Sequence, residues 1–130
     1  MRLILALLAL LATPASACAV PEEFSVSDLG LGPIVVVANV ADYRLEDHEG
    51  IVTLDVSEVW KGTAPDHLIA RWGVAMAEQP PQTWDRPTAV IAALTVSEQG
   101  FDLIVEVCGR AWLVPDTPDT RRDIRAALAP

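Results

Sequence analysis

The sequence predicts a small all-β domain that is followed by one short helix. Three observations support this class: several short runs are rich in β-branched residues, one run alternates apolar and polar residues, and the one clear helical pattern lies near the C-terminus. The chain has 130 residues, which is enough for one compact domain. Its net charge of −9 disfavours nucleic acid as a partner, because an acidic surface repels phosphate groups.

Residues 1–17 have the features of a secretory signal peptide. Arg2 supplies a positive start, an apolar run extends from Leu3 to Ala12, and Ala15-Ser16-Ala17 forms a small-residue cleavage site. The apolar run is too short to span a bilayer. We therefore expect a mature domain of residues 18–130 without a transmembrane segment, exported to the periplasm or the extracellular space as a monomer.

The first predicted strand, Ile34 to Ala41, follows from its density of β-branched residues, and its first half is expected to be buried on both faces. Before it, Glu22 to Leu29 could hold one helical turn. The polar stretch Asp42 to Gly50 ends in Glu49-Gly50, which predicts the turn of a hairpin.

The return strand shows the clearest alternation in the chain. The apolar phase then shifts by one residue at Glu58-Val59-Trp60, which predicts a β-bulge before Lys61-Gly62. The strand is expected to turn Val52, Leu54 and Val56 toward the core, and Asp55 and Ser57 toward solvent.

Three further strands are predicted in the second half of the chain. They are Leu68 to Val74, Thr88 to Leu94 and Phe101 to Cys108, with a proline-rich loop from Ala77 to Pro87 between the first two. In the first of them Leu68, Ala70 and Trp72 share one face, and Ile69 and Arg71 share the other. Five strands with short turns predict an antiparallel OB-type β-barrel over about residues 34–108.

A terminal helix is predicted over residues 118–128. Thr117 is a suitable N-cap, and Pro118 suits the first helical position. Arg121, Arg122 and Arg125 lie on this helix among acidic residues, and we expect them to form a solvated face.

The chain contains two cysteines, Cys18 and Cys108. In an oxidising compartment they are expected to form one disulfide, which would close a loop of about 90 residues and contribute about 4 kcal/mol in the chain-entropy model. The alternative is a lipid-anchored envelope protein, because Ala15-Ser16-Ala17-Cys18 also resembles a lipobox. Acylation would use the Cys18 sulfur and leave Cys108 as a thiol.

A resemblance to a known family is carried by three features. They are the expected first residue Cys18, the motif Val59-Trp60-Lys61-Gly62 at the end of an alternating strand, and Cys108-Gly109-Arg110 ahead of the helix. Together they resemble the bacterial relatives of the netrin-like domain, the OB-barrel module shared with the tissue inhibitors of metalloproteinases. The resemblance covers nearly all of residues 18–130 and implies a structural role for the four-residue motif.

The resemblance also implies a binding mode. Inhibitors of this type place the amine and carbonyl of an N-terminal cysteine on the zinc of a protease. Cys18 matches that residue by position, and Ala19, Val20 and Pro21 would line the same contact. Val20 stands where those inhibitors have a second cysteine, so only one bridge is available here.

The sequence contains no pattern that requires catalysis. It lacks a Gly-x-Ser-x-Gly elbow, and Asp47-His48-Glu49 is interpreted as a solvated loop tip because consecutive residues on a turn point in different directions. His67 is interpreted as a turn residue at the start of a strand. With two histidines and two committed cysteines, we expect no metal site, no cofactor and no enzymatic activity.

The four tryptophans are the remaining candidates. Trp60 and Trp72 are expected to pack, since they lie on strands with apolar neighbours. Trp84 lies in the proline-rich loop, which has few apolar residues for it to pack against, and it is the best candidate for an external contact. The sequence therefore predicts an exported, non-catalytic protein-interaction module whose partner is unknown and could be an extracytoplasmic protease. The alternative is a glycan-binding OB domain.

Overall fold

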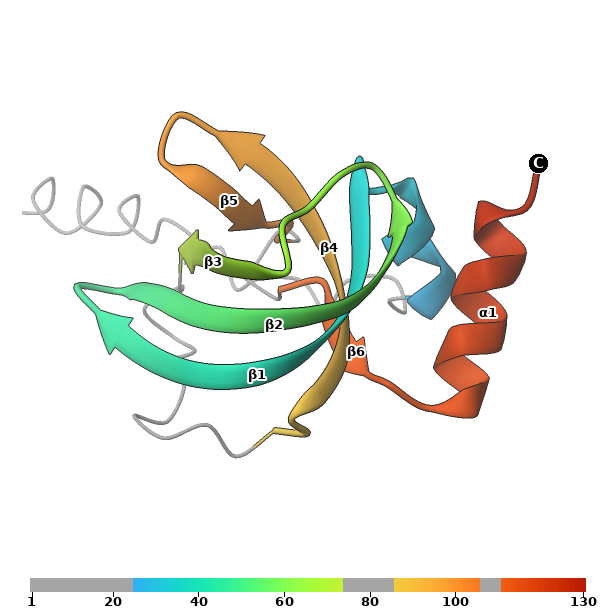
Figure 1. Cartoon of the computed structure of the whole chain (residues 1–130), viewed down its shortest axis with the longest axis horizontal. Coiled ribbons are helices and arrows are strands. Elements are labelled where there is room, and N and C mark those ends of the chain that lie inside the picture. The colour runs from blue at the N-terminus through green and yellow to red at the C-terminus, as the bar shows by residue number, and fades with distance from the viewer. Residues whose placement is uncertain (1–24, 74–85, 106–110) are drawn as a thin grey trace, which may run out of the picture.

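The structure, a computed structural model, describes residues 25–73, 86–105 and 111–130 (Figure 1). Within these ranges the chain forms a 3₁₀-helix, six strands and an α-helix. In chain order they are η1 (Val26–Leu31), β1 (Ile34–Glu46), β2 (Glu49–Lys61), β3 (His67–Gly73), β4 (Ala89–Ser97), β5 (Gly100–Leu103), β6 (Leu113–Pro115) and α1 (Pro118–Leu128). No helix in the described part of the chain is long and apolar enough to cross a membrane.

The strands form a closed barrel, which confirms the predicted five-stranded OB-type fold. Neighbours follow the order β1-β2-β3-β5-β4, and a β1–β4 pairing closes the ring. The short strand β6 pairs with residues 90–92 of β4, on the edge opposite β1. The expectation of a wholly antiparallel barrel is wrong for one seam, because β3 and β5 run parallel. The cause is topological: β4 pairs with β1 across the barrel, and β5 then returns beside β3 in the same direction.

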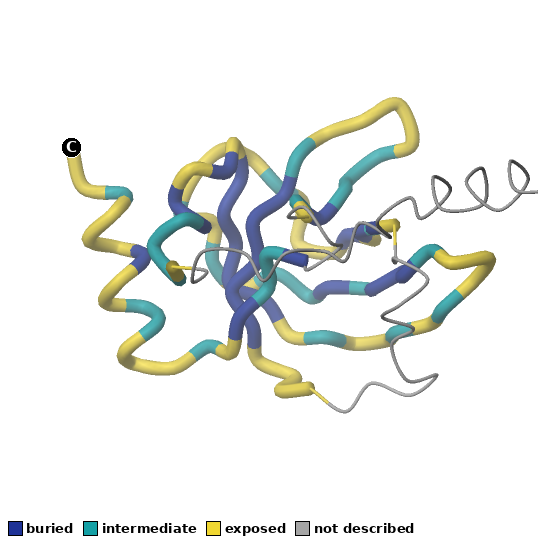
Figure 2. The backbone as a smooth tube through the Cα atoms, turned by 180° about the vertical axis from the view of Figure 1, so that it is seen from behind, coloured by how far each residue is buried: buried dark blue, intermediate teal, exposed yellow. Residues whose placement is uncertain are grey.

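The barrel is filled by the inward side chains of all five strands, which form one core cluster. A second cluster covers the outside of β1 and β4, where Val35, Val37 and Ile91 pack with Leu29 of η1 and Ile124 of α1. The first half of β1 is therefore buried on both faces, as its sequence predicts. In Figure 2 the buried residues follow these central strands, while α1 is mostly exposed.

The β1–β2 hairpin extends the strands beyond their predicted ends. Its turn lies at Asp47 and His48, which both have positive φ, rather than at Glu49-Gly50 as predicted. Gly50 has a different role: a Cβ there would lie 2.5 Å from ring atoms of Trp72, so this glycine lets the indole pack on β2. A register shift leaves Trp60 without an opposite residue on β1, which confirms the predicted bulge.

The orientation of β2 and β3 also follows the predicted alternation. Val52 and Leu54 are fully buried, Val56 packs at the edge of the core, and Ser57 is exposed. The last predicted strand, Phe101 to Cys108, is shorter: β5 ends at Leu103. The strand β6 was not predicted, because its three residues are too few to show a periodic pattern.

The helix α1 has the predicted bounds, 118–128. Thr117 caps it in a capping box with Thr120, and its buried residue is Ile124. The helix lies beside η1 at the opposite end of the molecule from the β1–β2 turn (Figure 1).

Candidate functional site

Two hollows lie on the side of the barrel formed by β2, β3 and β5. OB barrels bind oligomeric ligands through the face of their second and third strands and through the loops that follow strands 1 and 4. The two hollows include residues from these same elements, so they are the first candidates for a binding site.

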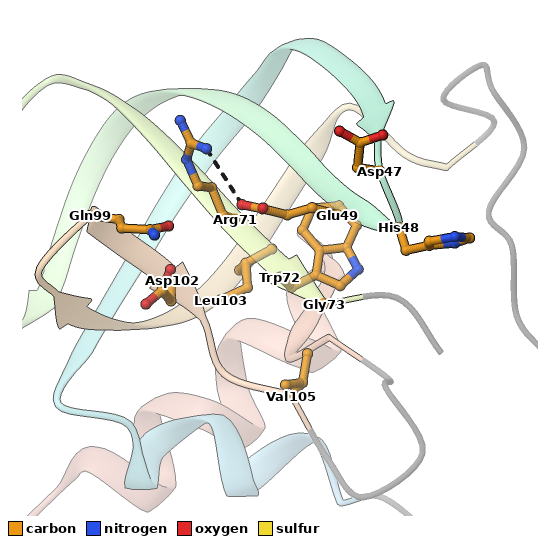
Figure 3. A pocket seen from close by; sticks show the side chains of 10 residues that line it. All are labelled: Asp47, His48, Glu49, Arg71, Trp72, Gly73, Gln99, Asp102, Leu103 and Val105. Carbon is orange, nitrogen blue, oxygen red and sulfur yellow. Dashed lines mark hydrogen bonds and ion pairs between the residues drawn. The ribbon is translucent and has the colours of Figure 1, made fainter. Parts of the chain in front are cut away.

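The first hollow, the polar pocket, has a volume of about 470 Å³ (Figure 3). It joins the β1–β2 turn to the end of β3 and to the β4–β5 hairpin. Glu49 Oε1 lies 3.5 Å from Arg71 Nη1 across one wall. Its lining residues are Asp47, His48, Glu49, Arg71, Trp72, Gly73, Gln99, Asp102, Leu103 and Val105.

The polar pocket offers hydrogen-bond donors and acceptors from several strands. Asp47 and His48 are exposed, in agreement with the predicted loop tip, but Glu49 turns from this tip toward Arg71. In the part of the chain that the structure describes, no three histidine or carboxylate side chains are grouped so that they could hold a metal ion. The lining combines carboxylate, guanidinium and amide groups, so the pocket can both accept hydrogen bonds from a polar ligand and donate to it.

The second hollow, the apolar groove, has a volume of about 510 Å³. Ile69 is 47% exposed on its rim, and Leu68 forms part of its floor. At one end His67 Nδ1 lies 2.6 Å from Asp55 Oδ1 on the neighbouring strand. The lining residues are Thr53, Pro65, His67, Leu68, Ile69 and Phe101.

The apolar groove exists because the β3–β5 seam is short. The two strands pair only at Ala70–Phe101 and Arg71–Asp102, and β5 begins at Gly100. The first half of β3 therefore extends past the start of β5. Val96, the partner of Phe101 on β4, is 65% exposed in the same hairpin.

A third cluster, the helix clamp, joins α1 to the end of β2. Arg121 donates to Asp116 and, at 2.8 Å, to Glu58, which also accepts from Trp60 Nε1 at 2.8 Å. The guanidinium groups of Arg121 and Arg125 lie 5.6 and 4.6 Å from the Trp60 ring centroid. The hydrogen bonds from Trp60 and then from Arg121 lower the pKa of Glu58 below its ordinary value.

The helix clamp corrects the predicted solvated arginine face. Arg122 does remain in solvent, where it pairs with Asp119 and Asp123 of its own helix. Arg121 instead bridges two elements, and hydrogen bonds to Asp116 and Glu58 raise its pKa further above the ordinary value. The reason is that β2 ends beside α1 and brings Glu58 and Trp60 to the helix.

The motif Val59-Trp60-Lys61-Gly62 lies at this same end of β2. Lys61 Nζ donates to the carbonyl of Gly30 at 2.9 Å. Gly62 has a φ of +73°, and a Cβ at this position would lie 2.6 Å from the carbonyl oxygen of Pro33. Val59 is 42% exposed. The contacts of the other three residues hold β2 against η1, the start of β1 and α1.

The remaining predicted site residues lie outside the described residues. They are Cys18, Ala19, Val20 and Pro21, the tryptophan Trp84 and the second cysteine Cys108. The apolar groove was missed by sequence reasoning, although one indication was present: Ile69 is a β-branched residue on the outward face of a strand, with no predicted element to cover it.

Neither a protein-family model nor a curated protein matches this chain.

Proposed function

We propose that this protein is an exported, non-catalytic protein-interaction module built on an OB-type barrel. The observation that carries the proposal is the apolar groove, where the exposed side chain of Ile69 lies beside Leu68 and Phe101. Apolar side chains that gather in one exposed hollow are typical of surfaces that bind other proteins. Covering such a groove gains free energy, at about 25 cal/mol for each Å² of apolar surface removed from water.

The test of this function is capture of a partner with a matched pair of variants. Ile69→Lys places a charge in the groove, whereas Val59→Lys adds the same charge at a similarly exposed position of β2 outside it. We expect the wild type and Val59→Lys to capture the same protein from an envelope or secreted extract, and Ile69→Lys to lose it. Equal capture by all three would contradict the proposal, as would turnover of a peptide, ester or glycoside substrate.

The polar pocket supports a second candidate, a glycan-binding OB domain. The two loops that OB barrels use for oligosaccharides both contribute to it, and Gln99, Asp102 and Arg71 offer the donors and acceptors that hydroxyl groups require (Figure 3). This candidate predicts glycan binding that Asp102→Ala or Trp84→Ala weakens and Ile69→Lys leaves unchanged. Absence of binding to a glycan array would remove it.

The resemblance to the netrin-like domain adds a narrower proposal for the partner, an extracytoplasmic zinc protease. The amine and carbonyl of Cys18 would bind the protease zinc, with Ala19, Val20 and Pro21 beside them. One residue added before Cys18 should then abolish inhibition, because the amine must be unacylated. Inhibition should also weaken below the α-amine pKa of about 8. Full inhibition by the extended protein would refute this mechanism.

The state of Cys18 can be read from the intact mass of the exported protein. A disulfide with Cys108 predicts the mass of residues 18–130 less two hydrogens, and no alkylation before reduction. A mass increase matching a diacylglycerol and a fatty acyl group would identify a lipid-anchored envelope protein and exclude zinc binding by the amine.

A further inference from the structure

We propose that β3 accepts an extended, cationic peptide segment of a protein partner as an additional strand, alongside His67–Ile69. This inference rests on the proposed interaction function and names the chemistry of the partner at the apolar groove. It combines three observations: a strand edge with no ladder partner among the described residues, an apolar groove beside that edge, and an acidic rim.

The first observation is the direction of the backbone groups of β3. The amide of Val56 donates to the carbonyl of Asp66 at 2.7 Å, which makes this a hydrogen-bonded pair of the antiparallel β2–β3 ladder. Such pairs alternate along a ladder, so Leu68 and Ala70 also direct their N–H and C=O groups to β2. The backbone groups of His67 and Ile69 therefore point away from β2.

On that far side the described residues provide no strand for the first half of β3. The parallel pairing with β5 begins only at Ala70–Phe101. Among residues 25–73, 86–105 and 111–130, the N–H and C=O of His67 and the N–H of Ile69 consequently have no ladder partner. Such an edge pairs readily with another extended chain, and peptides bind many proteins by this addition of a strand.

The second observation is the position of the apolar groove. Its residues include all three of His67, Leu68 and Ile69, so a strand added at this edge would lie along the groove. Alternate side chains of the added strand would then face Phe101 and Leu68. Backbone pairing would supply affinity, and an apolar side chain in the groove would supply selectivity.

The third observation is the charge at the end of the groove. Asp66 precedes β3, and Asp55 lies opposite His67 on β2 and pairs with its imidazole. Both carboxylates are at least partly exposed. The chain as a whole carries a net charge of −9. A cationic segment complements this rim, whereas a second copy of the chain would bring the same carboxylates against it. The favoured occupant is therefore a foreign strand of alternating apolar and basic residues.

The test uses the peptide Ac-Lys-Val-Lys-Ile-Lys-Val-Lys-NH₂ and a version with N-methyl groups on alternate residues. The two peptides share charge and side chains, but the methylated one lacks the backbone donors of one edge. We expect fluorescence-detected binding of the first peptide to the exported chain, weakened about tenfold or more by methylation.

Protein variants locate the contact. Ile69→Lys should weaken peptide binding about tenfold or more, and Val59→Lys should not, although both add one positive charge. Ile69→Pro removes an N–H that points away from β2, so the β2–β3 ladder should persist while peptide binding is lost. Circular dichroism and the melting temperature establish that each variant is folded.

Equal binding of the two peptides, or equal effects of Ile69→Lys and Val59→Lys, would overturn strand addition and indicate attraction by charge alone. A dimer seen by sedimentation in the wild type and lost in Ile69→Lys would assign the edge to a second copy and also overturn it. If a partner captured through Ile69 persists while the peptide test fails, only this inference fails. If Ile69→Lys has no effect on capture, the proposed interaction function fails as well.

Discussion

The first halves of β1 and β3 belong to one barrel but have opposite surroundings. In β1 each edge has a partner strand, and the outward residues Val35 and Val37 are covered by η1 and α1. In β3 one edge is paired with β2, the other edge has no ladder partner among the described residues before Ala70, and the outward residue Ile69 is half exposed. The difference follows both the composition of the strands and what lies outside them: β1 begins with four apolar residues in a row and is covered by η1 and α1, whereas β3 begins with His67.

The covered side of the barrel packs against η1 and α1, whereas the β3 side carries the apolar groove that we propose as a binding surface. The covered side combines apolar packing with the helix clamp, which satisfies the polar groups that α1 brings to the barrel. On the β3 side Ile69 is half exposed, and among the described residues the N–H groups of His67 and Ile69 have no ladder partner. Substitutions should therefore affect stability on the first side and binding on the second.

The largest expected effect is on the covered side. Ile124→Ala removes the fully buried residue that joins α1 to η1 and β1, and it should cost about 3 kcal/mol of unfolding free energy. Ile69→Ala on β3 should change that free energy by no more than about 0.5 kcal/mol. Urea denaturation of both variants measures the difference. Similar losses would show that the groove is part of the stabilising core.

Substitutions at two glycines are expected to change the free energy of unfolding by an intermediate amount. Gly62→Ala forces a side chain into a left-handed conformation and against the carbonyl of Pro33, so it should destabilise by about 2 kcal/mol. At Gly73, the last residue of β3, an added Cβ meets nothing within 4 Å, and Gly73→Ala should be neutral or stabilising by about 0.5 kcal/mol. Urea denaturation measures both changes in unfolding free energy. If Gly62→Ala and Gly73→Ala changed it by the same amount in the same direction, the contrast between the covered side and the β3 side would be contradicted.

The smallest expected effect concerns pH and the helix clamp. Folding lowers the pKa of Glu58 from 4.5, so its contribution to stability is present above pH 4.5 and is lost as the pH falls through the lower, folded value. Glu58→Gln should lower the melting temperature at pH 7 and reduce its dependence on pH below 4.5. Glu46→Gln, at a carboxylate paired only within β1, is the matched control and should behave as the wild type. If Glu58→Gln kept the wild-type dependence of melting temperature on pH, Glu58 would not stabilise the fold through the helix clamp.

Local patterns were sufficient to predict much of the fold. The alternation of Val52, Leu54 and Val56 sets the orientation of β2, and Thr117-Pro118 marks the start of α1. The position of the hairpin turn was predicted wrongly, because Gly50 looks like a turn residue until Trp72 is placed against it. The solvated face was wrong at Arg121, because its partner Glu58 is 63 residues away in the chain.

By itself the sequence determined which segments form the five barrel strands and which of their faces are apolar, since these depend on side-chain periodicity over a few residues. Only the tertiary structure decided that β3 and β5 run parallel and meet at two pairs of residues. The length of that seam depends on where β5 begins after β4 has crossed to β1, and no local pattern encodes this. The apolar groove, and the edge of β3 that lacks a ladder partner in the described part of the chain, are consequences of that arrangement, which is why the candidate binding site became visible only in the folded chain.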